Sequence, residues 1–204
     1  MYAIAPPRLI LAFAALALGA LLAPDRTQSA ESPRASLAGQ FLIATTAMRD
    51  PRFDHAVILI LRHDGDGAFG IVINRPLGQR PMADLLGAGD TAASRNVQVF
   101  SGGPVQPNMG FVVHSTDYHR AETLDVDGRV AMTSSREVLR DIADKKGPAK
   151  ALIAFGYAGW APGQLEAELA RNVWYTAPED PGLVFDDDRD KVWEHATARR
   201  TQDL

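Results

Sequence analysis

Polar side chains that could bind or transform a ligand gather where the apolar runs of this 204-residue chain end. Asn74 and Arg75 directly follow the apolar run 68–73, which predicts a strand. Arg75 could hold a carboxylate or a phosphate through two parallel hydrogen bonds. In the structural alternative, Arg75 pairs with an internal acid and Asn74 fixes a turn. Both residues are candidate ligand contacts.

A glycine-rich turn supplies two further candidates, Gly102 and Gly103, which precede Pro104. Their backbone N–H groups could form an anion-binding nest, although a tight turn alone would also explain them. No Gly-Lys-Ser/Thr follows, which argues against a nucleotide-binding P-loop.

A second glycine-rich turn lies between the apolar run 151–157 and a helix predicted over 165–172. Backbone N–H groups become available to ligands where such a helix begins. Trp160 could cap the core or line a groove, and Gln164 faces the same side of the helix as Glu168, one turn on. Backbone geometry alone is the alternative for this turn.

Histidine chemistry receives little support. The five histidines are His55, His63, His114, His119 and His195. None has the spacing of a metal site, and His63 with Asp64 is typical of a solvated turn. His114 and Ser115 are neighbours on a predicted strand, so they point to opposite faces and do not form a nucleophile–base pair. With no cysteine in the chain there is no thiolate metal site. Since the sequence also has no zinc signature and no dinucleotide-binding motif, we expect no metal and no cofactor.

The composition indicates an ordered globular chain, with 46% hydrophobic and 23% charged residues. The net charge of -4 and the absence of a Lys/Arg block argue against non-specific binding of nucleic acid.

Residues 1–30 resemble a targeting segment, because Arg8 precedes the apolar run 9–23, which is short for a membrane span. A signal peptide predicts an exported, periplasmic protein. The alternatives are an uncleaved N-terminal anchor, or a misassigned start codon with translation beginning near Leu37, which predicts a cytoplasmic protein. We expect no other membrane-spanning segment. Residues 31–38 would form a linker and residues 39–204 one domain.

Patterning predicts both strands and helices in this domain. The strands fall at 41–45, 56–61, 68–73, 97–100, 110–114, 123–126, 130–133, 151–157 and 173–176. The helices fall at 81–86, 134–145, 165–172 and 189–199. Asp64-Gly65-Asp66-Gly67 predicts a hairpin, and Ser134 with Glu137 a capping box.

Successive motifs along the chain resemble those of the YqgE/AlgH family. They are Gly39–Ala44, Asp50–Phe53, Gly70–Pro76, Gly102–Val105, Val113–Ser115, Gly156–Glu166, Asn172–Trp174 and Leu183–Phe185. The resemblance implies an α+β fold: a single compact domain with a barrel-like, mixed or antiparallel β-sheet and helices packed around it. It implies no established activity. The family is labelled as transcriptional regulators through a genetic association, and its members mostly lack a leader such as 1–38.

We therefore expect a non-enzymatic binding or regulatory protein with an unknown small ligand or protein partner. Its site would draw on Asn74, Arg75, Gly102, Gly103, His114, Trp160 and Gln164. The alternative is an enzyme acting on a small acidic substrate, with Arg75 as anion anchor and His114 as general acid or base. That alternative requires Arg75 and His114 to open into one cavity.

Overall fold

The computed structural model describes residues 36–87, 95–185 and 188–201. The chain divides into two units, Met1–Arg34 and Ala35–Leu204, and the described residues all belong to the second. The expectations for a leader over 1–30 and for most of the 31–38 linker lie outside the described residues. Among the residues that are described, no helix is long and apolar enough to cross a membrane.

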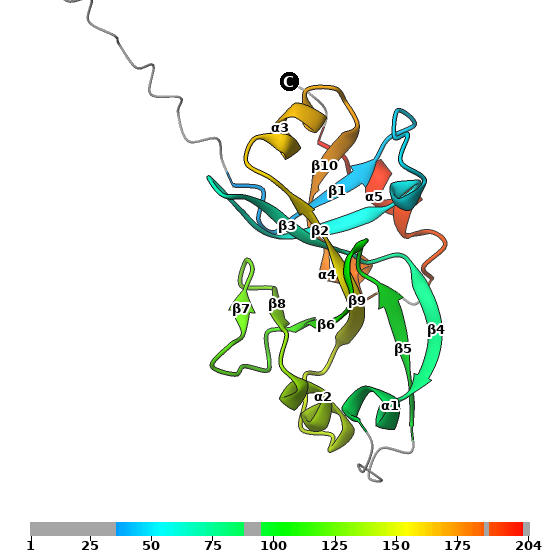
Figure 1. Ribbon diagram of the computed structural model, residues 1–204, viewed down its shortest axis with the longest axis vertical. Coiled ribbons are helices and arrows are strands. Elements are labelled where there is room, and N and C mark those ends of the chain that lie inside the picture. The colour runs from blue at the N-terminus through cyan, green and yellow to red at the C-terminus, as the bar shows by residue number, and fades with distance from the viewer. Residues whose placement is uncertain (1–35, 88–94, 186–187, 202–204) are drawn as a thin grey trace, which may run out of the picture. The chain divides into compact units, whose positions relative to one another are not determined.

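Strand β9 (Ala151–Trp160) is the strand on which the sheet is assembled (Figure 1). Along one edge it pairs antiparallel with β6 (Val105–Ser115). Along the other it pairs first with β5 (Asn96–Ser101), in parallel, and then with β3 (Gly67–Val72). Because β9 changes partner along its length, it joins the two halves of a curled sheet.

The sheet has the order β10-β1-β2-β3-β9-β6-β8-β7, and β4 pairs with β5 beside this path. The remaining strands are β1 (Gln40–Ala44), β2 (Val57–Asp64), β4 (Pro76–Pro81), β7 (Leu124–Asp125), β8 (Val130–Thr133) and β10 (Trp174–Pro178). The helices are η1 (Pro51–Phe53), α1 (Met82–Leu86), α2 (Arg136–Ala143), α3 (Gln164–Leu169), α4 (Pro181–Val184) and α5 (Val192–Ala198). The expected single α+β domain, with a mixed and mainly antiparallel sheet, is confirmed.

The predicted hairpin between β2 and β3 is confirmed, with Asp64 opposite Gly67. Gly67 has a φ of 120°, and a Cβ at this position would lie 2.1 Å from the carbonyl oxygen of Trp160. The turn therefore requires glycine, because β9 passes close beside it.

Helix α2 is shorter than the predicted range 134–145, and its start differs from the prediction. Ser135 occupies the N-cap position and makes no side-chain cap bond, so the expected capping box of Ser134 and Glu137 does not form. Burial holds the helix instead, through Val138, Leu139 and Ile142.

Strands β1 and β2 are buried on both faces, which explains their unbroken apolar sequences. Successive side chains of β1 alternate between two clusters. Phe41 packs in the cluster that contains Val192 of α5. Leu42 packs in the cluster that contains Leu165 of α3 and Trp174 of β10. Helices α5 and α3 therefore cover opposite faces of this part of the sheet.

One acidic side chain is enclosed by the fold. Glu179, just after β10, has a fully buried side chain, and Arg129 Nε lies 2.9 Å from its Oε1. Neither carboxylate oxygen of Glu179 accepts a well-formed hydrogen bond from the described residues. Burial, followed by the neighbouring Asp127 carboxyl, raises the pKa of Glu179 to about 7. Glu179 and Asp127 link the β7–β8 turn to the end of β10.

This burial predicts that Glu179 controls stability at neutral pH. The folded protein holds the Glu179 proton more tightly than an unfolded chain does. Its contribution to stability is therefore complete below the ordinary pKa of 4.5 and is lost as the pH rises through about 7. Glu179→Gln keeps the shape without the charge, so we expect it to exceed the wild type in free energy of unfolding by about 1–3 kcal/mol at about pH 8.5.

Urea unfolding at pH values on both sides of 7 measures this difference, which should shrink toward acidic pH. Glu194→Gln, an exposed change on α5, is the matched control. A difference between Glu179→Gln and the wild type that is independent of pH would contradict the prediction.

Candidate functional site

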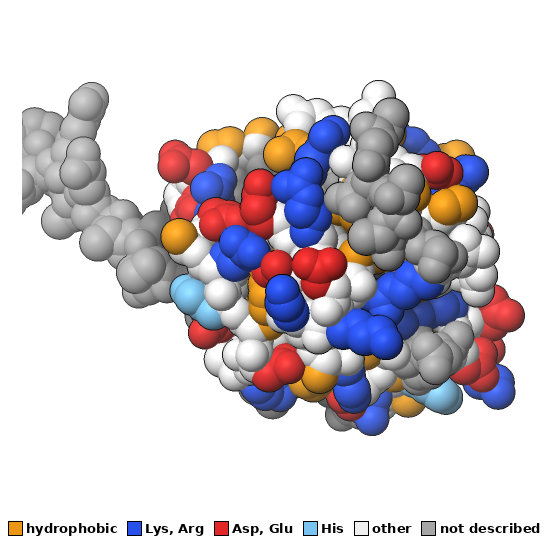
Figure 2. Space-filling view, turned by 90° about the horizontal axis from the view of Figure 1, so that it is seen from below, with side chains coloured by type: hydrophobic (Ala, Val, Ile, Leu, Met, Phe, Trp, Pro, Cys, Tyr) orange, Lys and Arg blue, Asp and Glu red, His pale blue; other side chains and the backbone are white. Residues whose placement is uncertain are grey.

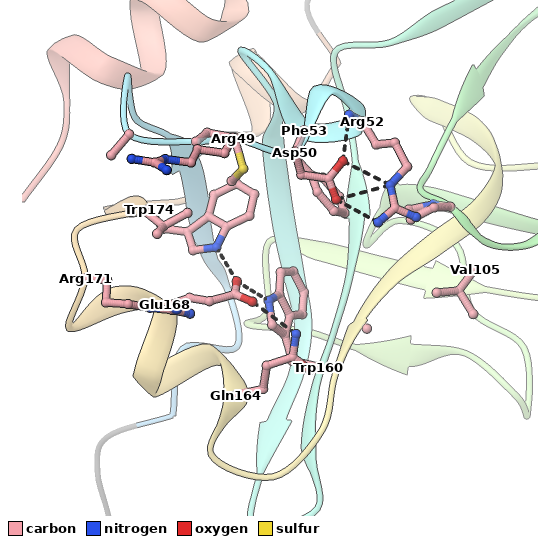
Figure 3. Close-up of a pocket in the computed structure, with 15 residues that line it drawn as sticks. Arg49, Asp50, Arg52, Phe53, Val105, Trp160, Gln164, Glu168, Arg171 and Trp174 are labelled. Atoms are coloured by element: carbon pink, nitrogen blue, oxygen red, sulfur yellow. Dashed lines mark hydrogen bonds and ion pairs between the residues drawn. The ribbon is translucent and has the colours of Figure 1, made fainter.

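A cleft of about 690 Å³ opens beside helix α3 (Figure 3). It is bounded by the segment after β1, the end of β9, the start of β6, helix α3 and the start of β10. Its larger apolar side chains are Met48, Phe53, Val105, Trp160, Val173 and Trp174. The volume falls in the range of small-molecule sites. We call it the aromatic cleft.

The wall of the aromatic cleft is organised by a single carboxylate, that of Glu168. Its Oε2 accepts a hydrogen bond from Trp160 Nε1 at 2.9 Å and another from Trp174 Nε1 at 2.8 Å. Both indoles are buried and need an acceptor, and one acid on α3 serves both. Glu168 thereby ties β9 and β10 to the helix.

Gln164 completes this arrangement at the start of α3. Its Nε2 donates to Glu168 Oε1 at 3.0 Å, and its Oε1 accepts from the backbone N–H of Ala161 at 3.2 Å. The preceding Gly163 takes the left-handed conformation, with a φ of 74°, which lets the chain leave β9 and enter the helix at once. Gln164 therefore fixes both the turn and the Glu168 carboxylate.

The aromatic rings of the cleft contact one another edge to face. The Trp160 and Trp174 centroids lie 6.1 Å apart at 79°, and those of Phe53 and Trp174 lie 5.7 Å apart at 74°. Phe53 is placed by the short helix η1, which Asp50 caps by accepting a hydrogen bond from Arg52 N at 2.9 Å. This geometry suits contact with apolar groups.

Three arginines lie at the cleft, and one of them is neutralised. Arg52 binds Asp50 through both Nε and Nη2, and these hydrogen bonds lower the pKa of the Asp50 carboxyl. Within the described part of the chain, Arg49 and Arg171 form no ion pair. Arg171, just after α3, donates from Nε to the carbonyl of Ala167 in that helix at 3.0 Å.

The predicted residues Trp160 and Gln164 both line this cleft, whereas Asn74 and Arg75 do not. Asn74 Oδ1 accepts from Val57 N at 2.9 Å and its Nδ2 donates to the His55 carbonyl at 2.8 Å, so it ties down the start of β2. Arg75 Nη2 donates to the Asp54 carbonyl. These contacts fit the structural alternative.

The Gly102–Gly103 turn packs against β9. A Cβ on Gly102 would lie 2.3 Å from the Gly156 carbonyl oxygen, and one on Gly103 would lie 2.1 Å from the Tyr157 carbonyl carbon. Gly102 N donates to the Phe155 carbonyl at 2.7 Å, so this N–H is already used by the protein. The two residues that follow the turn, Pro104 and Val105, do line the aromatic cleft.

His114 is enclosed, with an exposure of 0%. Its Nδ1 lies 2.9 Å from the Ser115 carbonyl oxygen and its Nε2 lies 2.9 Å from Thr133 Oγ1. Burial lowers the pKa of the imidazole, which favours its neutral form. His114 therefore opens into no solvent-accessible cavity with Arg75, and the condition for the acidic-substrate enzyme is not met.

His63 also has a structural place. Its Nδ1 accepts from Leu37 N at 3.0 Å and its Nε2 lies 2.8 Å from Glu166 Oε1. It thus connects the segment before β1 to α3. No group of three side chains in the described residues has the arrangement of a metal site.

Sequence reasoning alone did not select Arg49, Arg171 or Trp174 as site residues. Their common position follows from the pairing of β1 with β10, which sets Ala44 opposite Trp174. The only sequence signal lay in the motifs Asp50–Phe53 and Asn172–Trp174, which carry the family resemblance.

Comparison with known proteins gives a consistent result. Residues 41–204 match the family described as AlgH-like. A UPF0301 protein of Methylococcus capsulatus is 43% identical over 79% of this chain and 90% of its own length. One from Rhodospirillum rubrum is 46% identical over 74% of this chain and 80% of its own length.

Two solved structures share the fold. The solution structure of the AlgH protein from Pseudomonas aeruginosa is 40% identical, with a TM-score of 0.71 over 83% of this chain and 91% of that one. A crystal structure of a protein from Corynebacterium diphtheriae has a TM-score of 0.60 at 21% identity, covering 80% of this chain and 87% of that one.

Removing the shared acceptor should destabilise the protein. Glu168→Ala leaves two buried indole N–H groups without their acceptor, each costing about 1–2 kcal/mol, so we expect a loss of about 2–4 kcal/mol in free energy of unfolding. Glu168→Gln keeps one acceptor oxygen and should lose roughly half as much. Urea unfolding followed by circular dichroism measures both.

Glu194→Ala, an exposed acid on another helix, controls for loss of a surface charge. If Glu168→Ala costs no more than this control, the Glu168 carboxylate does not organise the cleft.

Proposed function

This chain belongs to the AlgH-like family, whose function is uncharacterised, so we propose a function from the geometry of the chain itself. The proposal is that the protein binds a ligand without catalysing a reaction, and that the aromatic cleft is the ligand site. The observation that carries the proposal is an open cleft with an apolar lining, framed by two indoles whose polar atoms are already satisfied. Such a surface gains free energy by burying an apolar group of a ligand.

The lining offers little for catalysis. Its described residues include no serine, threonine, cysteine, histidine, lysine or tyrosine. Its two carboxylates are engaged: Asp50 by Arg52, and Glu168 by the two indoles and Gln164. A general base needs a free position facing the substrate, and neither acid has one in this arrangement. Binding alone is the function that these side chains support.

A regulatory role would then act through the bound ligand or a protein partner rather than through a basic surface. The chain carries a net charge of -4. On the face shown in Figure 2, acidic and basic side chains alternate over one half, while over the other half several basic side chains lie side by side. A continuous positive surface is the usual footprint of nucleic-acid binding.

The three tryptophans allow a direct test of the site. We expect phenylacetamide, a neutral aromatic probe, to shift the indole N–H resonances of Trp160 and Trp174. Trp193 should not respond, because its Nε1 donates to the Ala44 carbonyl and it does not line the cleft. Heteronuclear NMR of labelled protein measures all three signals, each assigned through its Trp→Phe variant.

A cleft-filling variant provides the control. Val105→Phe adds bulk to the cleft wall, where Val105 is 36% exposed, and should abolish the shifts. Leu77→Phe makes the same kind of change at a residue that is 55% exposed and outside the cleft, and should preserve them. Equal responses in the two variants, or a response at Trp193 alone, would refute the site.

A further inference from the structure

The charges around the aromatic cleft are unbalanced. Its lining carries three guanidinium groups, those of Arg49, Arg52 and Arg171, against two carboxylates. Asp50 neutralises Arg52 through a bidentate pair, which leaves Glu168 as the remaining acid. The cleft is thus net positive in a protein whose overall charge is -4.

The remaining acid is turned toward the protein. Glu168 Oε2 accepts from both indoles and its Oε1 accepts from Gln164, so three donors compensate its charge. The arginines are arranged differently. Arg49 and Arg171 are exposed and, within residues 36–87, 95–185 and 188–201, neither forms an ion pair with an acid. In Figure 3 they lie on either side of the Trp174 ring.

Resting on the proposed binding function, we infer that the ligand of the aromatic cleft is a small organic acid. Its apolar or aromatic body packs along Met48, Phe53 and Val105, and its carboxylate is bound by Arg49 and Arg171. Guanidinium groups match the planar, two-oxygen geometry of a carboxylate. The apolar lining contributes affinity, and the arginines select the sign of the charge.

A cationic ligand is the physical competitor, since edge-to-face aromatic rings beside a carboxylate also form cages for quaternary ammonium groups. The structure disfavours it for two reasons. Trp160 and Trp174 are 7% and 3% exposed, so their ring faces are covered by the protein. A cation would also approach Arg49 and Arg171, while the two acids of the described lining, Asp50 and Glu168, are already engaged by other groups.

Three probes of similar size and different charge separate these ligand classes: phenylacetate, phenylacetamide and benzyltrimethylammonium. Each is titrated into labelled protein, and the indole signals of Trp160 and Trp174 report its dissociation constant. Phenylacetate should bind roughly 3- to 10-fold more tightly than phenylacetamide, a modest factor because the arginines are solvent-exposed.

The preference for phenylacetate over phenylacetamide should depend on Arg49 and Arg171 and on the salt concentration. In Arg49→Gln/Arg171→Gln we expect phenylacetate to bind no better than phenylacetamide, whose own affinity stays unchanged. Arg80→Gln, an exposed arginine on β4 outside the cleft, should retain the full preference. Raising the salt concentration should weaken phenylacetate only.

The outcomes distinguish this inference from the proposed function. Equal binding of all three probes at the cleft would overturn the organic-acid inference while the binding function stands, and tighter binding of benzyltrimethylammonium would do the same. A preference for phenylacetate that survives the double substitution would also overturn it. If no probe shifts Trp160 or Trp174, the binding function itself fails.

Discussion

The architecture depends on a backbone contact at the middle of β9. Gly102 lies very close to Gly156. A Cβ on Gly102 would lie 2.3 Å from the Gly156 carbonyl oxygen, and a Cβ on Gly156 would lie 2.3 Å from the Gly103 carbonyl oxygen. Gly102 N donates to the Phe155 carbonyl, and Gly102 O accepts from Val72 N at 2.9 Å. One glycine therefore connects β3 to β9 at the point where β9 exchanges β5 for β3. A side chain at Gly102 would force these two backbones apart, and with them the residues Pro104 and Val105, which line the cleft.

The aromatic cleft is a consequence of that curl. Pro104 and Val105 follow the glycine contact and form one side, while Trp160 ends β9 and leads into α3 on the other. The Glu168 carboxylate then holds the second side together by joining two strands to one helix. The residues that complete the fold thus also form an open apolar surface whose polar atoms already have hydrogen-bond partners. Such a surface suits the proposed site, which would bury an apolar group of the ligand and select ligands by their charge.

Local pattern was sufficient for much of the fold. The Asp-Gly steps at 64–67 predicted the hairpin, and the apolar run 151–157 predicted β9, because turn chemistry and burial act on neighbouring residues. Local pattern was not sufficient to predict which residues line the cleft. Trp160 and Gln164 were found from their turn, but Arg49 and Arg171 come together only through the pairing of β1 with β10, which no local pattern encodes. The sequence makes Asn74 and His114 candidate ligand contacts, and in the structure their side chains make hydrogen bonds within the protein. A polar residue among apolar neighbours has the same sequence signature in either role.

The contact of His63 with the segment before β1 has a consequence for where the domain begins. Leu37 N donates to His63 Nδ1, and the other ring nitrogen faces Glu166 on α3, two residues from Glu168. The match to the AlgH-like family starts only at residue 41. A protein trimmed to that boundary would lose the first residue of β1, Gln40, and also the donor that orients His63, which faces Glu166 on α3. The contacts that hold α3 in place therefore include a residue, Leu37, that lies upstream of the family match.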